Sequence, residues 1–376
     1  MLVLTALATL IWAYLLLGHG RFWRSAPELP AARPTATPSV AIVIPARDEA
    51  PVIATTIRSL AAQDYAGPLR IILVDDNSTD HTGDIARSFA DPRLTVLTGA
   101  PRPTGWSGKL WAVAQGLTEA RRAETGPPDL LLLTDADIDH KPGHLAALVA
   151  QQETTGCDLV SEMVALRCQS LAEQALVPAF VFFFQLLYPF SRVNDSQTNT
   201  AAAAGGTILL HRRALERIGG IEAVRGKLID DVALAAAVKK GGRIWLGHST
   251  LAASLRPYPG FADIWAMVAR TAYVQLRFSP ILLLGTVLAM VLAWLIPPAA
   301  ALFTHGTARW LGIAAWIMLS ASYLPTLRRY QCSRLWAPFL PLVAAFYLAA
   351  TIGSAVNHHR GRGVAWKGRA YQGTGG

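Results

Sequence analysis

The chain has 376 residues, of which 52% are hydrophobic and only 16% are charged. Soluble domains carry roughly 25% charged residues, so part of the chain is expected to contact lipid, and the composition excludes intrinsic disorder and a small disulfide-bonded scaffold. The net charge is +9, but ten Lys and Arg residues and no acidic residue follow Asp263, which leaves the first 263 residues at −1. The net positive charge is thus confined to the apolar C-terminal region. This favours anionic lipid headgroups, and not nucleic acid, as the partner of that region.

The first twenty residues, 1–20, carry no Lys, Arg, Asp or Glu, and Arg21 and Arg24 follow directly. A cleaved signal peptide would have its positive charges before the apolar run, whereas here they come after it. We therefore predict an uncleaved transmembrane anchor with the N-terminus outside and the following residues in the cytoplasm. Residues 21–39, rich in Pro and Ala, are predicted to be an extended linker.

Residues 40–260 show the pattern of one α/β domain. Short apolar runs at 40–45, 70–75, 94–97 and 130–134 alternate with helical patterns at 52–62, 81–90 and 109–121. Such alternation predicts a mostly parallel sheet with right-handed crossovers. In sheets of this kind, ligands bind beyond the carboxyl ends of the strands.

Acidic residues follow three of these four predicted strands. They are Asp48 and Glu49 after the first, Asp75 and Asp76 at the end of the second, and Asp135, Asp137 and Asp139 after the fourth. So many carboxylates at one edge repel each other unless a cation or a donor-rich ligand binds there. The D-x-D pair of Asp135 and Asp137 therefore predicts a Mg²⁺ or Mn²⁺ site. The alternatives are a solvated turn for this pair and helix capping around Asp76.

Two further motifs place charges at predicted helix starts. Lys109, in the sequence GWSGKL, opposes the helix dipole there unless it serves a bound anion, although a surface lysine is the alternative. Asp230 and Asp231 begin another helix, where they could cap it or supply one general base. The three cysteines form no CxxC pair, so neither a disulfide framework nor a zinc site is expected.

Three uncharged stretches near the C-terminus, at 278–304, 310–327 and 335–357, are long enough to span a bilayer, and Pro297 and Pro298 would kink or end the first. Residues 358–376 form a basic tail. If all four segments span the membrane, the loop containing Arg328 and the basic tail lie on opposite sides, so they cannot both satisfy the positive-inside rule. One C-terminal segment could be re-entrant, and the side on which the tail lies stays open. The apolar stretches 176–190 and 261–278 could contact the bilayer surface or pack in the core, and we expect 261–278 to be an interfacial helix.

Taken together, PARDEA, VDDNSTD, GWSGK, TDADID and the later Asp-Asp pair resemble the family-2 glycosyltransferases, inverting enzymes of the GT-A fold that use nucleotide sugars. The runs AAAAGGTILLHRRALERIGG and FADIWAMVARTAYVQL resemble the hopanoid-biosynthesis-associated branch of this family. The resemblance implies a Rossmann-like GT-A domain with one N-terminal and about three C-terminal transmembrane helices, and a donor that is a UDP-sugar or a related nucleotide sugar.

The resemblance also implies roles for individual residues. Asp231 would be the catalytic base, and Asp135 and Asp137 would bind the divalent metal. The residues that bind the donor would be Pro45, Asp48, Glu49, Asp75, Asp76, Lys109, Arg270 and, in addition to its role at the metal, Asp135.

Two departures from the family pattern bear on function. The usual Glu-Asp pair is Asp230-Asp231 here, which keeps the base. Of the Q/R-x-x-R-W motif of processive members only Arg270 remains, so transfer of a single sugar is expected.

The resemblance implies a multi-pass protein of the bacterial inner membrane with a cytoplasmic catalytic domain. Its acceptor would be the hydroxyl of a hopanoid or related isoprenoid lipid, and other lipid-biosynthesis enzymes would be further partners. The alternatives are a polyprenyl-phosphate glycosyltransferase, whose acceptor needs no general base, and a catalytically silent membrane scaffold that binds nucleotide or lipid.

Overall fold

A computed structural model describes residues 1–122, 126–361, 365–366 and 369–370. The chain divides into two compact units. The first, called the helical unit, comprises Met1–Ser25, Arg167–Ser191 and Pro257–Ala365; the second, called the sheet unit, comprises Ala26–Leu166, Arg192–Arg256 and Trp366–Gly376. The tail residues Arg362 and Lys367, expected to be basic neighbours of lipid, lie outside the described residues.

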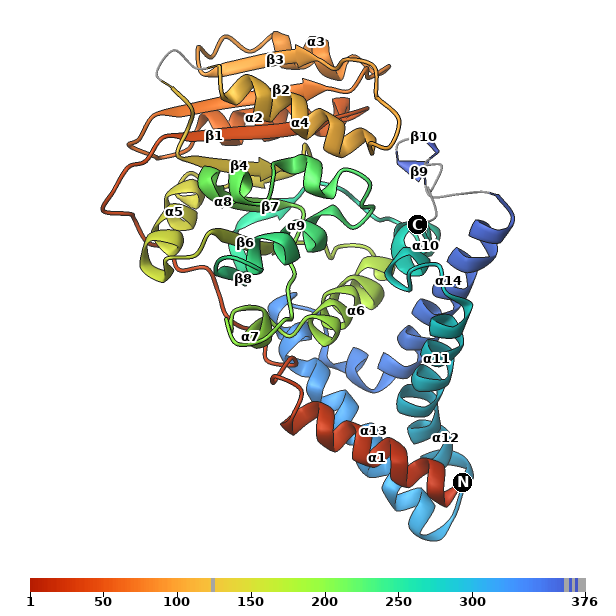
Figure 1. Cartoon of the computed structure of the whole chain (residues 1–376). Helices are drawn as coiled ribbons and strands as arrows, with labels where there is room; N and C mark the ends of the chain where they lie inside the picture. The colour runs from red at the N-terminus through yellow and green to blue at the C-terminus, as the bar shows by residue number, and fades with distance from the viewer. Residues whose placement is uncertain (123–125, 362–364, 367–368, 371–376) are drawn as a thin grey trace. The chain divides into compact units, whose positions relative to one another are not determined.

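The sheet unit is built on an eight-stranded sheet in the order β3-β2-β1-β4-β7-β6-β8-β5 (Figure 1). The strands are β1 (Val40–Ala46), β2 (Leu69–Asp75), β3 (Leu94–Thr98), β4 (Leu130–Thr134), β5 (Ile138–His140), β6 (Leu159–Ala165), β7 (Thr207–His211) and β8 (Ile244–Ser254). The first four confirm the predicted strands. Two residue pairs, β9 (Ala365–Trp366) and β10 (Arg369–Ala370), form a separate small sheet.

Four of the seven strand pairings in this sheet are parallel, and the antiparallel ones lie in its second half. The sheet is therefore mixed, with β1, β2, β3 and β4 all parallel. In the register, Ala46 of β1 lies beside Asp75 of β2. The three strands that precede the acidic motifs thus end at the same edge, as predicted.

Helices of the sheet unit are α2 (Ala50–Ala61), α3 (Thr82–Arg87), α4 (Gly108–Ala120), α5 (His144–Thr155), α8 (Arg212–Arg217) and α9 (Asp230–Lys239), with the short helix η1 (Ile221–Val224); α7 (Phe190–Val193) lies at the junction with the helical unit. The amphipathic pattern of α2 buries Ile53, Ile57 and Leu60. These side chains pack with Ile42 and Ile44 of β1 in one hydrophobic core. Burial on both faces explains why β1 and β4 read as continuous apolar runs.

The helical unit contains α1 (Leu2–Leu17), α6 (Leu171–Leu187), α10 (Phe261–Gln275), α11 (Pro280–Met290), α12 (Ile296–Phe303), α13 (Gly306–Arg329) and α14 (Leu340–His359). A π-helical turn, η2 (Val291–Leu295), joins α11 to α12 just before Pro297, and the 3₁₀ helix η3 (Arg334–Phe339) leads into α14.

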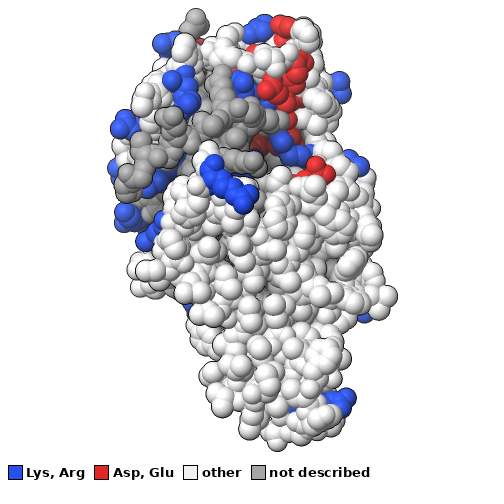
Figure 2. Space-filling view, turned by 90° about the vertical axis from the view of Figure 1, so that its right-hand side faces the viewer, with Lys and Arg blue, Asp and Glu red and all other residues white. Residues whose placement is uncertain are grey.

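Three helical segments are long and apolar enough to cross a membrane: Pro280–Phe303, Gly306–Arg329 and Arg334–His359. They confirm the three predicted C-terminal segments. The surface at the height of α11, α12 and α13 shows almost no charged side chains on the face in Figure 2. The N-terminal helix α1 is also apolar, but at 16 residues it is shorter than these three, so its role as a membrane anchor stays a prediction.

The apolar stretch 176–190 falls mainly in α6, whose Phe182 is fully buried. Its ring lies 5.3 Å from that of Phe22 and 5.3 Å from that of Tyr323, both edge-on. This side of α6 therefore packs in the core of the helical unit, as one of the two alternatives predicted. The other stretch forms α10, on which Phe261 is about half exposed and Tyr273 is buried.

A glycine of α4 allows this helix to pack closely on β1. A Cβ atom at Gly116 would lie 2.5 Å from Cγ1 of Val43. We expect Gly116→Ala to lower the free energy of unfolding, because overpacking costs about 1–3 kcal/mol, against roughly 1 kcal/mol gained from the helix propensity of Ala. Thermal unfolding in detergent, followed by Trp fluorescence, measures the change. Gly143→Ala is the control, since a Cβ there meets nothing within 4 Å; equal melting temperatures for the two variants would contradict this account.

Candidate active site at the edge of the sheet

The site lies beyond the carboxyl ends of β1, β2 and β4, in the sheet unit. Loops after these strands carry Asp48 and Glu49, Asp76, and the pair Asp135 and Asp137. On the surface shown in Figure 2, Asp and Glu side chains gather in one band with Lys and Arg side chains beside them. Each group of carboxylates is held by a basic side chain, and these pairings define three parts of the site.

The first part joins the ends of β1 and β2. Asp76 is 1% exposed, and Arg47 contacts it through both the backbone oxygen and the carboxylate, with Nη1 3.9 Å from Oδ2. The same guanidinium lies 3.7 Å from Asp48, whose carboxylate accepts a 2.8 Å hydrogen bond from the Thr79 amide. Asp75 accepts a hydrogen bond from the Ser78 amide and thereby closes the turn after β2. This part presents carboxylates of fixed orientation, as recognition of a base or ribose requires.

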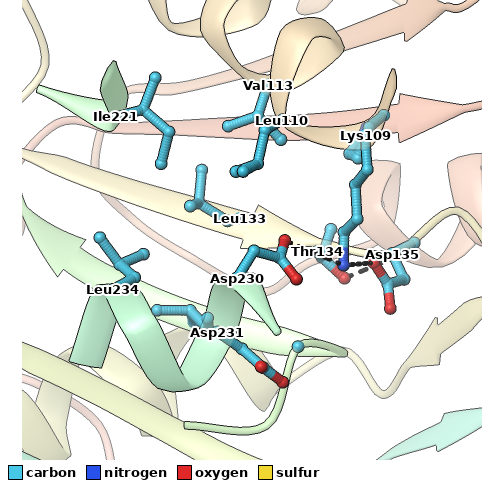
Figure 3. A pocket seen from close by; sticks show the side chains of 13 residues that line it. Lys109, Leu110, Val113, Leu133, Thr134, Asp135, Ile221, Asp230, Asp231 and Leu234 are labelled. Carbon is cyan, nitrogen blue, oxygen red and sulfur yellow. Dashed lines mark hydrogen bonds and ion pairs between the residues drawn. The ribbon is translucent and has the colours of Figure 1, made fainter. Parts of the chain in front are cut away.

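The second part surrounds Lys109 at the start of α4. Its ammonium lies 2.7 Å from Oδ1 of Asp135 and 3.8 Å from Oδ2 of Asp230 (Figure 3). Burial alone would lower the pKa of Lys109, but these two carboxylates outweigh it and raise that pKa above its usual range. Burial also raises the pKa of Asp135. The lysine thus stays charged and pairs with two carboxylates of the protein, and its contact with a bound anion stays a prediction.

Asp231 sits on the first turn of α9, on the other side of the same pocket (Figure 3). Burial, together with the charge of Asp230, raises the pKa of Asp231 to about 7. Its Oδ1 accepts a 2.8 Å hydrogen bond from the Val232 amide. A carboxylate with this pKa can exchange a proton with a substrate near neutral pH.

The pocket combines these charged groups with an apolar wall. Figure 3 shows Leu110 and Val113 of α4, Leu133 of β4, and Ile221 and Leu234 opposite the three carboxylates and Lys109. Pro45, Thr134, Gly205 and Ile208 complete the lining. The pocket therefore includes five of the residues singled out from the sequence or from the family resemblance: Pro45, Lys109, Asp135, Asp230 and Asp231.

Close packing fixes the backbone beneath these groups. A Cβ atom at Gly205 would lie 3.2 Å from Oδ2 of Asp231 and 3.4 Å from the ammonium of Lys109. A larger residue at this position would press on the carboxylate of Asp231 and touch Lys109. No pattern in the sequence AAAAGG indicated this role, because it depends on side chains from two distant helices.

The third part is formed by a residue that sequence reasoning missed. Arg256, just after β8, donates from Nε to Oδ2 of Asp137 and from Nη2 to Oε1 of Glu49, both at 2.7 Å. It thereby joins the loop after β1 to the loop after β4. The only sequence signal is a basic residue soon after a long strand, and that signal is weak.

A buried chain of polar groups supports the end of β4 and was also missed. His144 lies between Glu162, at 2.5 Å, and His140, at 2.9 Å, and His140 contacts the Thr134 hydroxyl at 3.1 Å. Burial and the neighbouring imidazole hold the pKa of His140 well below its usual range. His140 is therefore neutral, and the Thr134 hydroxyl that it contacts also donates a 2.9 Å hydrogen bond to the Gly206 carbonyl. These bonds fix the strand end immediately before Asp135.

The carboxylates fit a divalent cation of the Mg²⁺ type, though no metal cage is preformed. Among the described residues no group of three or more His, Cys, Asp or Glu side chains could hold a metal ion. Mg²⁺ is usually held by one or two carboxylates plus substrate phosphates, which is what Asp135 and Asp137 can offer. Both pair with basic side chains, so a metal must displace Lys109 or Arg256 from them. Arg270 lies on α10 of the helical unit, and its contact with the donor stays a prediction.

Comparisons with known proteins agree with this geometry. Residues 41–219 match the family described as Glycosyl transferase family 2. A 4,4'-diaponeurosporenoate glycosyltransferase of Staphylococcus aureus strain bovine RF122 / ET3-1 is 23% identical over 355 residues, which cover 89% of this chain and 88% of the relative. The corresponding enzyme of strain USA300 is 22% identical over 356 residues, with the same coverage of both chains.

Among solved structures, a mannosyltransferase from Pyrobaculum calidifontis in complex with GDP-Man and Mn²⁺ is similar in fold, with a TM-score of 0.53 and 21% identity. The similarity covers 94% of this chain and 99% of the other. The fold is thus of the GT-A type. The chain contains a glycosyl transferase family 2 domain followed by three long apolar helices, and the protein is a glycosyltransferase.

Proposed function

We propose that this glycosyltransferase moves a single sugar from a nucleotide-sugar donor to the hydroxyl of a membrane lipid, with Asp231 as general base. The observation that carries the proposal is the position of Asp231. It lies in the same pocket as Lys109 and Asp135, with a pKa of about 7. A base with a pKa near the working pH is the efficient choice for activating an alcohol.

Each part of the site has its own role in this reaction. Asp48, Asp75 and Asp76 would bind the nucleoside, with Pro45 and Glu49 beside them, while Lys109 and Arg270 would face the diphosphate or donor sugar. Asp135 and Asp137 would hold Mg²⁺ or Mn²⁺, which neutralises the leaving diphosphate when bound. The mannosyltransferase of similar fold binds GDP-Man with Mn²⁺, which supports a nucleotide sugar with a metal; the resemblance favours UDP as the nucleotide.

The proposed reaction is a single displacement at the anomeric carbon. Asp231 accepts the proton of the acceptor hydroxyl, and the hydroxyl oxygen forms a bond to the anomeric carbon. The bond from that carbon to the diphosphate oxygen breaks at the same time, and the nucleoside diphosphate leaves with the electron pair. Attack opposite the leaving group inverts the anomeric configuration. Lys109, which contacts the neighbouring Asp230, is the cation nearest to this exchange among the residues that line the pocket.

A lipid acceptor is supported by the helical unit and by the relatives. Three helices are long and apolar enough to cross a membrane, and the relatives act on 4,4'-diaponeurosporenoate, a carotenoid-like lipid acid. The family resemblance favours a hopanoid alcohol. We propose residues 1–20 as a further anchor, 21–39 as linker, 40–260 as catalytic domain, 261–278 as interfacial helix, 279–357 as membrane helices and 358–376 as basic tail. The catalytic domain would face the cytoplasm at a bacterial inner membrane, beside other lipid-biosynthesis enzymes.

The name of the relatives favours one second candidate, an acceptor that is already an anion. A carboxylate, like the phosphate of a polyprenyl carrier, has no proton to lose at neutral pH and needs no general base. The two acceptor classes therefore differ in their dependence on Asp231, and the first two predictions below separate them. The silent-scaffold alternative is not supported, because the chain is a glycosyltransferase.

Replacing Asp231 by Asn tests the base directly. We expect sugar transfer to a lipid alcohol to fall by about 100-fold or more, the usual contribution of a general base, while nucleoside diphosphate binding stays within about twofold. Transfer of labelled sugar in detergent micelles measures the first quantity and calorimetry the second. Asp195→Asn, at an exposed position, is the matched control. Full transfer by the Asp231→Asn variant would favour an anionic acceptor.

The pKa of Asp231 predicts a pH profile. The base must be deprotonated to act, and its raised pKa of about 7 means that more of it is protonated as the pH falls. We expect kcat/KM for the acceptor to rise with pH through about 7 and to level off above it. The measurement is the transfer rate from about pH 5.5 to about pH 9 at saturating donor, in steps of about half a unit. A flat profile across this range would contradict the role of Asp231.

Gly205 tests the packing of the catalytic groups. Gly205→Ala places a methyl group 3.2 Å from Oδ2 of Asp231 and 3.4 Å from the ammonium of Lys109, so the Asp231 carboxylate must move by a few tenths of an ångström. We expect kcat to fall about tenfold with little change in the melting temperature, because small displacements of catalytic groups are costly. The control is Gly143→Ala, which meets nothing within 4 Å. Unchanged kcat would show that the pocket tolerates the displacement and that the two side chains need not be held there.

A further inference from the structure

Arg256 is the side chain that connects two predicted parts of the donor site. Its guanidinium donates to Asp137, the predicted metal ligand, and to Glu49, a predicted nucleotide contact, both at 2.7 Å. The two carboxylates are 10% and 12% exposed, whereas the arginine is 33% exposed. The carboxylates are thus largely enclosed, and the guanidinium that neutralises them can be reached from solvent.

The backbone around Arg256 is tied to the same loop. The Leu255 amide donates to the Asp137 carbonyl at 2.7 Å, and Ser254 pairs with Ile138 where β8 runs antiparallel to β5. The arginine therefore cannot leave the metal-binding loop as a whole. A change of partner would therefore involve the side chain alone, which has several rotatable bonds.

Charge makes a change of partner favourable when the donor binds. A divalent cation on Asp137 takes over the role of the guanidinium and repels it at short range. The diphosphate that arrives with this cation offers oxygen pairs that match the guanidinium fork, which bonds phosphate in a bidentate manner. The guanidinium would thus leave the two carboxylates when the metal binds, and the diphosphate beside it would accept its hydrogen bonds.

We propose that Arg256 is a donor-binding residue that holds Asp137 and Glu49 together before the donor binds and transfers its guanidinium to the diphosphate when the metal and nucleotide bind. The inference rests on the proposed function, since it requires a nucleoside diphosphate and a divalent cation. It adds Arg256 to Lys109 and Arg270, the residues already predicted to face the diphosphate or donor sugar. It also predicts that metal and nucleotide bind as a pair. Without the nucleotide, the metal must displace the guanidinium while no diphosphate is present to accept its hydrogen bonds.

The exchange has a signature that a purely structural role lacks. Removing the guanidinium removes a competitor of the metal but also a ligand of the diphosphate. We expect Arg256→Gln to bind Mn²⁺ alone at least about threefold more tightly and UDP in the presence of Mn²⁺ at least about tenfold more weakly. Arg256→Lys keeps the charge without the fork, so Mn²⁺ binding should stay near that of the wild type while UDP binding weakens.

Titration calorimetry on the full-length protein in detergent measures both affinities. The first titration uses Mn²⁺ alone. The second uses UDP at saturating Mn²⁺, and it is repeated with GDP in place of UDP. The matched control is Arg217→Gln, which removes an arginine bonded to Asp158 at 2.6 Å in the same unit, outside the residues of the site. It should change neither affinity. Melting temperatures of all variants report on folding.

Each outcome decides the matter. Opposite changes in the two affinities support the exchange. If Arg256→Gln weakens both affinities, or changes neither, Arg256 only supports the loop and the inference is wrong, while the proposed function stands as long as the wild type binds Mn²⁺ with UDP or GDP. If the wild type binds neither nucleotide with Mn²⁺, the proposed function fails and the inference fails with it.

Discussion

The structure depends on how it neutralises the carboxylates that meet at one edge of its sheet. Parallel strands β1, β2 and β4 end together, so the acidic residues after them converge. Three basic side chains form ion pairs with these carboxylates: Arg47 with Asp48 and Asp76, Lys109 with Asp135 and Asp230, and Arg256 with Asp137 and Glu49. The site that we propose for a divalent cation and a diphosphate thus carries three basic side chains of its own, and guanidinium and ammonium groups are suited to bind a diphosphate.

Asp231 differs from this set because burial among charged neighbours, not a direct ion pair, sets its pKa. It comes from α9, beyond the sheet edge, and burial with Asp230 nearby raises its pKa to about 7. The roles that we propose therefore differ: the carboxylates at the sheet edge would bind a metal and a nucleotide, and Asp231 on α9 would accept a proton. The apolar side chains of Leu110, Val113 and Leu234 line the same pocket and lower the polarity around these charged groups.

Local patterns predicted the first half of the fold well. The runs that became β1, β2 and β4 are buried on both faces and end at acidic turns, so a parallel sheet and its binding edge follow from the sequence. The antiparallel strands β6, β7 and β8 were not predicted, because their pairing depends on contacts distant in sequence. For the same reason Arg256, 119 residues from Asp137, and Gly205 were missed. The three C-terminal apolar helices were predicted because length and lack of charge suffice.

The most direct test of the central claim, sugar transfer to a lipid hydroxyl with Asp231 as base, is mass spectrometry of extracted lipids. The strains are one with the gene intact, one with the gene deleted, and the deleted strain complemented with Asp231→Asn. The account predicts a lipid that carries one sugar in the first strain and is missing from the other two, with the sugar linked through an ether-type glycosidic oxygen. The same lipid in the complemented strain at the level of the first, or a sugar ester lost only on deletion, would contradict it.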